Sequence, residues 1–391
     1  MSHHALVIGA GLAGTASASA LVHKGWRVSL LESGDTPACA ASALPVGILS
    51  PLLTRAPTTL SRLSELGAAA MHKELARLLP EGQGWQSCQI QNLGHAPGQW
   101  PAAMVQPSVV IDAWLKEARA TGSLETRLNT PVDRLSQSEQ ASGPGWEALD
   151  ANGQVLCSAD AVVLAGAWRS VQLLKRSGFL PDNLDLFPLR PVKGQMSFAS
   201  LYGTPLAANP MRNNGVFVPD FSHLPRDGQP AERIWAMGST YERGADDASV
   251  TWEGHLRNLT SLRALSTQAA ATMAHAMEPP ATLRGWAGVR CASLDRVPLI
   301  GQMPDLVRWA AAPRSNRGWP RKLQPERVPR LPGFYVLTAL GSRGLTLAHW
   351  AGKELAALIS GSTMGFEADL QLAVDPARFG WRQLRQQIRP V

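Results

Sequence analysis

The feature that most constrains this chain lies at residues 5–32, where closely spaced glycines join an apolar run to an alanine-rich segment. Residues 4–8 predict a buried strand, residues 13–24 a helix and residues 27–31 a second strand, which together make a βαβ unit. An export or membrane segment is the alternative. Glycines and serines interrupt the run well short of the roughly 20 apolar residues that span a bilayer. The basic residues follow the apolar part instead of preceding it, unlike a signal peptide, so we expect a cytoplasmic protein.

Three glycines fall at the predicted turn from strand to helix in the spacing G-x-G-x-x-G. The first permits the tight turn, the second lets a pyrophosphate approach the backbone, and the third lets the helix and strand pack closely. The residues expected to bind a dinucleotide here are Gly9, Ala10, Gly11, Ala13 and Gly14.

Glu32 ends the second predicted strand, where a carboxylate accepts hydrogen bonds from ribose hydroxyls. Ser33 follows it at a position where enzymes that bind a 2′-phosphate carry arginine, which disfavours NADP. The residues alone leave FAD and NAD open.

The rest of the chain is mixed. Residues 60–79 predict a helix, residues 187–240 a series of strands, and residues 251–275 another helix. Short strands are expected at 126–135, 146–149, 154–157 and 159–168. Residues 333–359 repeat the plan of strand, glycine turn and helix. A nucleotide-binding unit at the start and a similar unit near the end, with a β-rich middle, predict a discontinuous α/β domain around an inserted one.

Charge and cysteine content narrow the function classes. The formal net charge of +7 favours polyanionic partners or substrates. The four cysteines are scattered without paired spacing, so neither a disulfide framework nor a metal site is expected.

Several segments resemble the glycine oxidase/D-amino-acid oxidase superfamily of FAD enzymes. The matching segments are "GAGLAG", "AASALPVGILSPL", "ADAVVLAGAW", "GWAGVRCASLDRVPLIGQMPD" and "LGSRGLTLAHWAGKELAALI". Within that superfamily, "GVRCASLDRVPLIG", "VDPARF" and "GSTYERGADDASVTWEGHLRNL" are most similar to the C-terminal oxidoreductase domain of the MnmC family, which modifies the wobble uridine of tRNA. The methyltransferase half of that family has no counterpart in this sequence, so a separate methyltransferase would be a further partner.

The resemblance implies FAD as cofactor, tRNA as substrate and a Rossmann-like FAD-binding domain with an inserted β-rich antiparallel substrate domain. The implied boundaries are 1–82, 107–185 and 285–391 for the FAD-binding domain, and 83–106 and 186–284 for the substrate domain. Beyond the first turn and Glu32, the implied FAD-binding residues are Ser42, Gly47, Val132, Ala165, Gly166, Trp168, Gly341, Ser342, Arg343, Gly344 and Leu345.

The implied reaction oxidises a 5-carboxymethylaminomethyl-(2-thio)uridine, which is an N-substituted glycine, to the 5-aminomethyl base and glyoxylate. Arg290 is the expected clamp for the substrate carboxylate, and an ion pair with Asp295 is the alternative. Arg343 is expected to add positive charge beside the flavin or the substrate. The alternative there is a helix capped by Ser342 with Arg343 exposed.

Two basic segments are candidates for contact with a phosphate backbone, and a solvated surface is the alternative for both. Arg378, Arg382, Arg385 and Arg389 recur at helical spacing, so one helix face could present them together. The second segment, which includes Arg321 and Lys322, has Trp309 and Trp319 beside it for base stacking.

Two other functions remain open from the sequence. One is an FAD-dependent oxidase or dehydrogenase of free glycine, sarcosine or a D-amino acid, which would need no basic surface. The other is a flavin-binding or tRNA-binding protein without catalytic activity.

Overall fold

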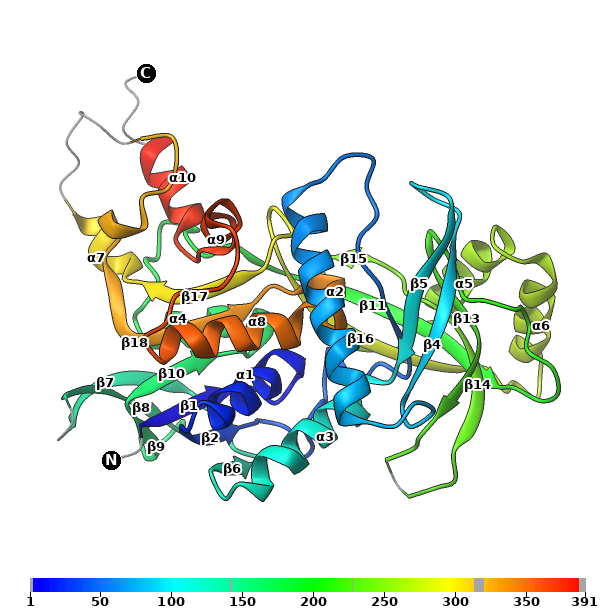
Figure 1. Ribbon diagram of the computed structural model, residues 1–391, viewed down its shortest axis with the longest axis horizontal. Coiled ribbons are helices and arrows are strands. Elements are labelled where there is room, and N and C mark those ends of the chain that lie inside the picture. The colour runs from blue at the N-terminus through cyan, green and yellow to red at the C-terminus, as the bar shows by residue number, and fades with distance from the viewer. Residues whose placement is uncertain (1–2, 141–142, 227, 313–319, 387–391) are drawn as a thin grey trace.

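The computed structural model describes residues 3–140, 143–226, 228–312 and 320–386. Within these ranges the strands form sheets of six, nine and three strands, named here the first, second and third sheet. Figure 1 shows the first sheet on the left and the second on the right, with helix α2 (Thr59–Leu78) between them. The chain therefore has the predicted mixed α/β class.

The first sheet has the strand order β17-β18-β10-β1-β2-β6. Its strands are β1 (His4–Ile8), β2 (Arg27–Leu31), β6 (Leu124–Arg127), β10 (Ala161–Leu164), β17 (Leu299–Pro304) and β18 (Arg330–Thr338). All neighbours are parallel except β17 and β18, and Leu6 lies in register between Ser29 and Val162. The carboxyl ends of the parallel strands therefore meet at one edge, where open α/β sheets bind ligands.

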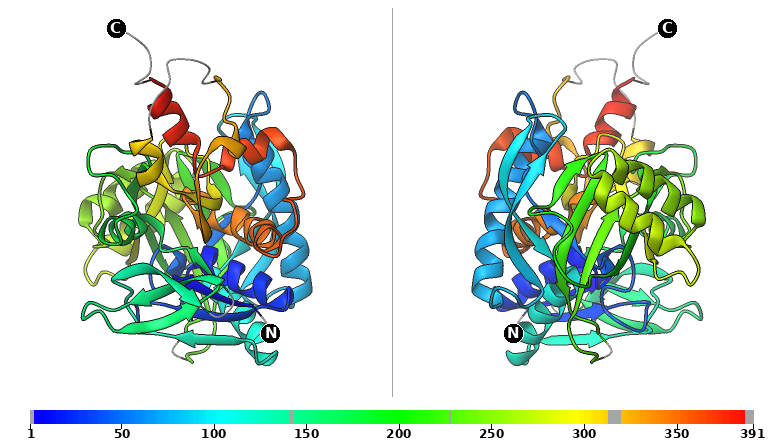
Figure 2. Two further views of the ribbon diagram at one scale, coloured as in Figure 1. Left: turned by 90° about the vertical axis from the view of Figure 1, so that its left-hand side faces the viewer. Right: turned by 90° about the vertical axis from the view of Figure 1, so that its right-hand side faces the viewer.

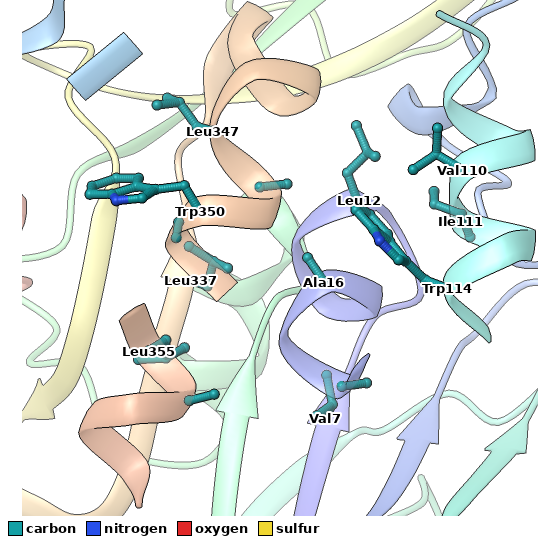
Figure 3. Packing of buried hydrophobic residues seen from close by; sticks show 14 of the residues in the cluster. Val7, Leu12, Ala16, Val110, Ile111, Trp114, Leu337, Leu347, Trp350 and Leu355 are labelled. Atoms are coloured by element: carbon teal, nitrogen blue, oxygen red, sulfur yellow. The ribbon is translucent and has the colours of Figure 1, made fainter. Parts of the chain in front are cut away.

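Helices α1 (Leu12–His23), α3 (Pro107–Ala120) and α8 (Gly344–Ile359) pack together beside the first sheet, and α2 packs against α8. Figure 3 shows Leu12 and Ala16 of α1 between α8 and the α3 residue Trp114, which is 1% exposed. A Cβ on Gly352 of α8 would lie 2.8 Å from the carbonyl carbon of Ala16, so glycine lets α1 and α8 approach closely. This packing fixes the amino ends of both helices.

The third sheet consists of β7 (Arg134–Gln140), β8 (Gly143–Leu149) and β9 (Val155–Ala159). Trp146 of β8 packs edge to face on Phe334 of β18, with ring centroids 4.9 Å apart, and donates to Pro332 O at 2.9 Å. The single strand predicted over 126–135 is wrong, because the chain leaves the first sheet after Arg127 and enters the third at Arg134.

The second sheet has the order β15-β11-β14-β13-β12-β4-β5-β3, and β16 pairs with β11. Its neighbours are antiparallel apart from β12 and β4. The strands are β3 (Gly47–Leu49), β4 (Trp85–Asn92), β5 (Gly98–Val105), β11 (Leu189–Ser200), β12 (Met211–Asn213), β13 (Gly215–His223), β14 (Glu232–Gly238), β15 (Glu242–Arg243) and β16 (Arg284–Ser293). The strands predicted within 187–240 are confirmed. β3 and β16 join this sheet from ranges that were assigned to the FAD-binding domain.

Helices α5 (Trp252–Arg263) and α6 (Thr267–Met277) pack on the second sheet at the right of Figure 1. The single helix predicted over 251–275 is wrong. The chain turns between them, and the Ser266 side chain caps α6 by accepting from Ala269 N at 3.2 Å.

The remaining helices are short. They are η1 (Ala41–Ala43), η2 (Ala167–Arg169), α4 (Ser170–Arg176), α7 (Leu306–Ala311), η3 (Pro325–Arg327), η4 (Gly341–Arg343), α9 (Ala368–Val374) and α10 (Arg378–Gln386). Figure 2 shows α7 and α10 together at one end of the molecule. None of the helices in the described ranges is long and apolar enough to cross a membrane.

Candidate active site

The turn between β1 and α1 brings backbone amides to the carboxyl edge of the first sheet. Gly9 has φ of +103°, a conformation that residues with a side chain rarely adopt. A Cβ on Gly14 would lie 1.7 Å from Gly9 O, so only glycine lets α1 begin this close to β1. Gly11 precedes α1 and lines a cavity, while Leu12 N donates to Ser42 Oγ at 3.1 Å, so the amino end of this helix meets the cavity beside Ser42.

Glu32 follows β2 directly, and backbone amides hold its carboxylate. Oε2 accepts from Ala10 N at 2.7 Å, and Oε1 accepts from Gly34 N at 2.9 Å. The carboxylate lines the same cavity as the glycine turn. Glu32 therefore lies where a carboxylate binds the ribose hydroxyls of a dinucleotide.

The cavity, of about 1150 Å³, extends from the glycine turn to the second sheet. Ala10 and Gly14 are the residues of the expected cofactor site that do not line it, because Ala10 holds Glu32 and Gly14 packs on Gly9. The expected residues in its wall are Gly9, Gly11, Ala13, Glu32, Ser42, Gly47, Val132, Ala165, Gly166, Trp168, Gly341, Ser342, Arg343, Gly344 and Leu345. The fold thus brings residues from both ends of the chain to one cavity.

The amino end of α8 opens into this cavity beside η4. Gly341 has φ of +57°, and no side chain caps α8. The alternative in which Ser342 caps the helix and Arg343 is exposed is therefore wrong, since Arg343 is half-buried. The positive end of the α8 dipole faces the cavity and favours negative charge there.

Arg290 reaches the cavity from β16. Its Nη2 donates to Ser239 Oγ and, at 3.4 Å, to Thr240 O, and its guanidinium lies 5.8 Å from the ring centroid of Tyr241. Burial lowers the pKa of Arg290, and Tyr241 opposes that shift. Within the described ranges no carboxylate pairs with Arg290, so the predicted alternative, an ion pair with Asp295, is wrong.

Two further half-buried arginines line the cavity without a carboxylate partner in the part of the chain that the structure describes, whereas Arg169 in the same wall is exposed. Arg343 precedes α8, and Arg212 lies on β12. Burial lowers the pKa of both guanidinium groups, and the charge of Arg212 lowers the pKa of Arg343 further. Sequence reasoning missed both Arg212 and Tyr241. Arg212 lies in none of the matching segments, whereas Tyr241 lies within "GSTYERGADDASVTWEGHLRNL", which could have identified it.

The cavity wall fits a flavin dinucleotide. A Cβ at Gly9 would lie 2.9 Å from Ala165 O, and one at Gly47 would lie 2.5 Å from Leu345 Cδ1. There is therefore no room for a side chain at these two positions of the cavity wall. The glycine turn suits a pyrophosphate, Glu32 a ribose, and the amino end of α8 the electron-rich edge of a flavin ring.

The expected basic face of the last helix is wrong for Arg378. This residue is 3% exposed, and its Nη2 lies 2.8 Å from Asp295 Oδ1. Arg382 is exposed but lies 3.3 Å from the same carboxylate, and Arg385 is half-buried. Arg389 lies outside the described residues.

The second basic segment differs in part from expectation. Trp309 is 4% exposed and packs against Trp381, with ring centroids 6.2 Å apart, so it is not free to stack on a base. Arg321 and Lys322 are exposed, and Trp319 lies outside the described residues. A role of Arg321, Lys322, Arg382 and Arg385 in nucleic-acid binding stays a prediction.

Comparisons with known proteins agree with this geometry. The family described as FAD dependent oxidoreductase (DAO) matches residues 4–103 and 98–358. A protein of Verminephrobacter eiseniae named tRNA 5-methylaminomethyl-2-thiouridine biosynthesis bifunctional protein MnmC is 30% identical over 430 residues, which cover 95% of this chain and 63% of that protein. The protein of the same name from Cupriavidus necator is 32% identical over 423 residues, 98% of this chain and 61% of its own length. The chain thus spans less than two thirds of these relatives.

Solved structures with the same fold include two amine oxidases. Glycine oxidase from Geobacillus kaustophilus has a TM-score of 0.65 at 19% identity, and the match covers 94% of this chain and 98% of that one. Iminodiacetate oxidase from Chelativorans sp. BNC1 has a TM-score of 0.64 at 17% identity, covering 93% and 97%. At these identities the likeness shows the fold alone.

Proposed function

The chain belongs to the family of FAD-dependent oxidoreductases, and we propose that it oxidises an N-substituted glycine carried on the wobble uridine of tRNA. The substrate is 5-carboxymethylaminomethyl-(2-thio)uridine. Loss of a hydride and a proton from the glycine CH–NH unit gives an imine, which water hydrolyses to glyoxylate and the 5-aminomethyl base. FAD supplies the hydride acceptor when bound.

The observation that carries this proposal is the unpaired cation at Arg290. Arg290 is half-buried at the cavity, and in the described ranges the acceptors of its hydrogen bonds are a hydroxyl and a carbonyl, which are neutral. A buried charge without a counter-ion is costly, so the site favours an anion. A planar guanidinium binds a carboxylate through two parallel hydrogen bonds, which would orient the adjoining C–N bond.

Arg343 and the amino end of α8 place further positive charge at the same cavity. This charge would stabilise the negative charge that develops when the flavin ring is reduced. Arg343 and Arg290 would therefore act on different groups.

Proton transfer makes modest demands on the protein. An amine that loses a hydride must first be neutral, and water can take its proton. The described wall of the cavity contains no histidine, and its carboxylates are Glu32, Asp246 and Asp247. Asp247 is engaged by Lys193, whose Nζ lies 2.7 Å from its Oδ1. The residues present thus suit substrate binding and orientation.

The assignment to tRNA is supported by the names of the relatives and by the net charge of +7. The exposed Arg321 and Lys322 offer cations to a phosphate backbone. Contacts of this kind would weaken as salt is raised.

Anaerobic mixing tests the proposal directly. The FAD-loaded protein is mixed with tRNA that carries the carboxymethylaminomethyl arm, with the same tRNA lacking the arm, and with glycine and sarcosine, while the visible absorbance of oxidised flavin is followed. Bleaching by the first tRNA alone is expected. Bleaching by the small amines alone would make the chain an oxidase of free amino acids, and no bleaching by any of them would favour a protein that binds without catalysis.

A further inference from the structure

We propose that Arg212 binds a second anionic group of the substrate, so that this site selects a dianion over an N-substituted glycine with one carboxylate. The inference rests on the proposed function for the glycine unit held at Arg290. It adds a specificity residue on β12, a different strand of the second sheet from the one that carries Arg290.

The cavity wall holds more positive charge than the proposed reaction uses. Its half-buried arginines are Arg212, Arg290 and Arg343, and among the described residues none of the three is paired with a carboxylate. Arg169 and Asp246 also line the cavity, but both are exposed to solvent, which screens their charges. The proposed reaction supplies a carboxylate for Arg290 and negative charge on the reduced flavin for Arg343. Arg212 is left without an anion. Because it costs free energy to desolvate even part of an unpaired charge, the half-buried guanidinium of Arg212 indicates a second negative group on the ligand.

Two neutral side chains hold the guanidinium of Arg212 in place. Nη1 donates to Ser50 Oγ at 2.8 Å and Nε donates to Asn92 Oδ1 at 3.2 Å. The Asn92 amide is itself fixed, since its Nδ2 donates to His95 O and, at 2.8 Å, to Ala96 O. These neutral acceptors orient the guanidinium without neutralising it.

In the part of the chain that the structure describes, both N–H groups of Arg212 Nη2 are free for a ligand. No residue in the described ranges accepts a hydrogen bond from its Nη2. A guanidinium that is already oriented loses little conformational freedom when it binds an anion. Arg212 is therefore organised for an anion before the substrate arrives.

Arg212 and Arg290 lie on strands that are well separated in the second sheet. Arg212 is on β12 and Arg290 is on β16, and strands β13, β14 and β11 lie between them in the second sheet. Four strand spacings of about 4.8 Å separate their backbones, so the two side chains meet different parts of a ligand. A second anion would therefore lie apart from the glycine carboxylate.

The second anion is a phosphate or a carboxylate, which a guanidinium binds in the same way. In the proposed function it is the phosphate of the modified nucleotide. In a small amine it would be the second carboxylate of a diacid such as iminodiacetate.

Binding of thioethers that cannot be oxidised as amines tests the claim without turnover. Methylthioacetate has one carboxylate and thiodiacetate has two, and each is titrated into the FAD-loaded protein while the flavin absorption spectrum is recorded. We expect thiodiacetate to bind roughly 10- to 100-fold more tightly, the gain of a charge-assisted hydrogen bond. Arg212→Gln should bring the ratio of the two dissociation constants near one, and Arg212→Lys should restore part of it.

Arg233→Gln is the matched control. Arg233 is on β14 of the same sheet, pairs with Asp220 at 2.6 Å and does not line the cavity. Equal affinity of the wild-type protein for the two thioethers, together with no Arg212-dependent advantage of a nucleotide 5′-monophosphate over its nucleoside, would overturn the proposal. A preference for the second anion that is unchanged in Arg212→Gln would overturn it as well. If Arg212→Gln loses FAD, the ratio of the two dissociation constants in the wild-type protein and in Arg212→Lys tests the proposal instead.

Flavin reduction then identifies the source of the anion. One pair of substrates is 5-carboxymethylaminomethyluridine and its 5′-monophosphate, and the other is sarcosine and iminodiacetate. If the monophosphate reduces the flavin faster than the nucleoside and the difference depends on Arg212, the second anion is the phosphate. If only iminodiacetate shows such an advantage over sarcosine, the second anion is a carboxylate, and the tRNA function is wrong while the role of Arg212 stands. Oxidation of tRNA that is insensitive to Arg212→Gln would keep the proposed function and overturn this inference.

Discussion

Asp295 follows Arg290 by five residues, yet its carboxylate binds Arg378, whose Nη2 lies 2.8 Å from Oδ1 and whose Nε lies 3.0 Å from Oδ2. Arg378 also donates to Val297 O at 2.6 Å and to Pro298 O at 3.1 Å. The Arg378–Asp295 ion pair holds α10 against the segment that follows β16. It also occupies the nearby carboxylate, so that Arg290 remains available to a ligand.

Replacing Arg378 with Met should destabilise the fold and leave FAD binding intact. The change removes the buried partner of Asp295 and leaves only the exposed Arg382 beside that carboxylate, at a cost of about 3 kcal/mol. Urea unfolding of the FAD-loaded protein measures the loss. Arg382→Gln is the control, since Arg382 is exposed beside the same carboxylate and its change should cost about 0.5 kcal/mol or less. Equal stability of the two variants would show that the Arg378 pair contributes little.

Replacing Arg290 with Gln should weaken substrate binding and keep the flavin. Loss of a bidentate contact to a carboxylate costs about 3 kcal/mol, or roughly 100-fold in kcat/KM. Anaerobic flavin reduction as a function of substrate concentration measures the change, and the absorbance ratio of flavin to protein measures FAD content. Arg233→Gln again serves as the control. If FAD is lost from Arg290→Gln, the residue supports the cofactor site instead of the substrate.

Replacing Gly14 with Ala should abolish FAD binding. The added Cβ would lie 1.7 Å from Gly9 O, so α1 must move away from β1 and its amino end from the pyrophosphate site. Gly94→Ala is the control, because a Cβ there would lie 3.5 Å from Asn213 Oδ1 as its nearest atom. FAD content after purification and titration of the apoprotein with FAD are the measurements. A Gly14→Ala protein with wild-type FAD affinity would contradict the role of this close approach.

Acid should destabilise the protein through His349 on α8. Burial lowers the pKa of His349 to about 4, and Glu74, 3.8 Å away, opposes that shift. Since histidine in the unfolded chain has a pKa near 6.5, the unfolded state binds more protons between pH 6.5 and 4, and stability falls as pH is lowered through that window. The expected loss between pH 7 and pH 4.5 is about 2 kcal/mol.

Urea unfolding at several pH values tests this expectation. His349→Gln should lose that part of the pH dependence, because glutamine does not titrate. His275→Gln is the control, since the His275 side chain is 88% exposed. An unchanged pH dependence in His349→Gln would assign the acid sensitivity to other groups.

Segments governed by short-range patterns were predictable. The bounds of β1 and β2 match the prediction, because apolar periodicity and three glycines specify a strand, turn and helix within some 30 residues. The prediction of one helix over 251–275 was wrong because the helical periodicity of the sequence continues through the turn between α5 and α6. Ser266 caps α6 after that turn, and both helices pack on the second sheet.

The sequence by itself determined the dinucleotide turn, the carboxylate at Glu32 and the glycine-bounded start of α8, since each depends on neighbours in the chain and on backbone conformation. Only the tertiary structure decided which charges are paired. Arg378 matched a basic helix face by spacing, but folding buries it against Asp295, and pairing of β12 with β4 and β13 delivers Arg212 to the cavity. The reason is physical: the free energy of an ionic group depends on burial and on partners from distant segments, which one-dimensional spacing does not contain.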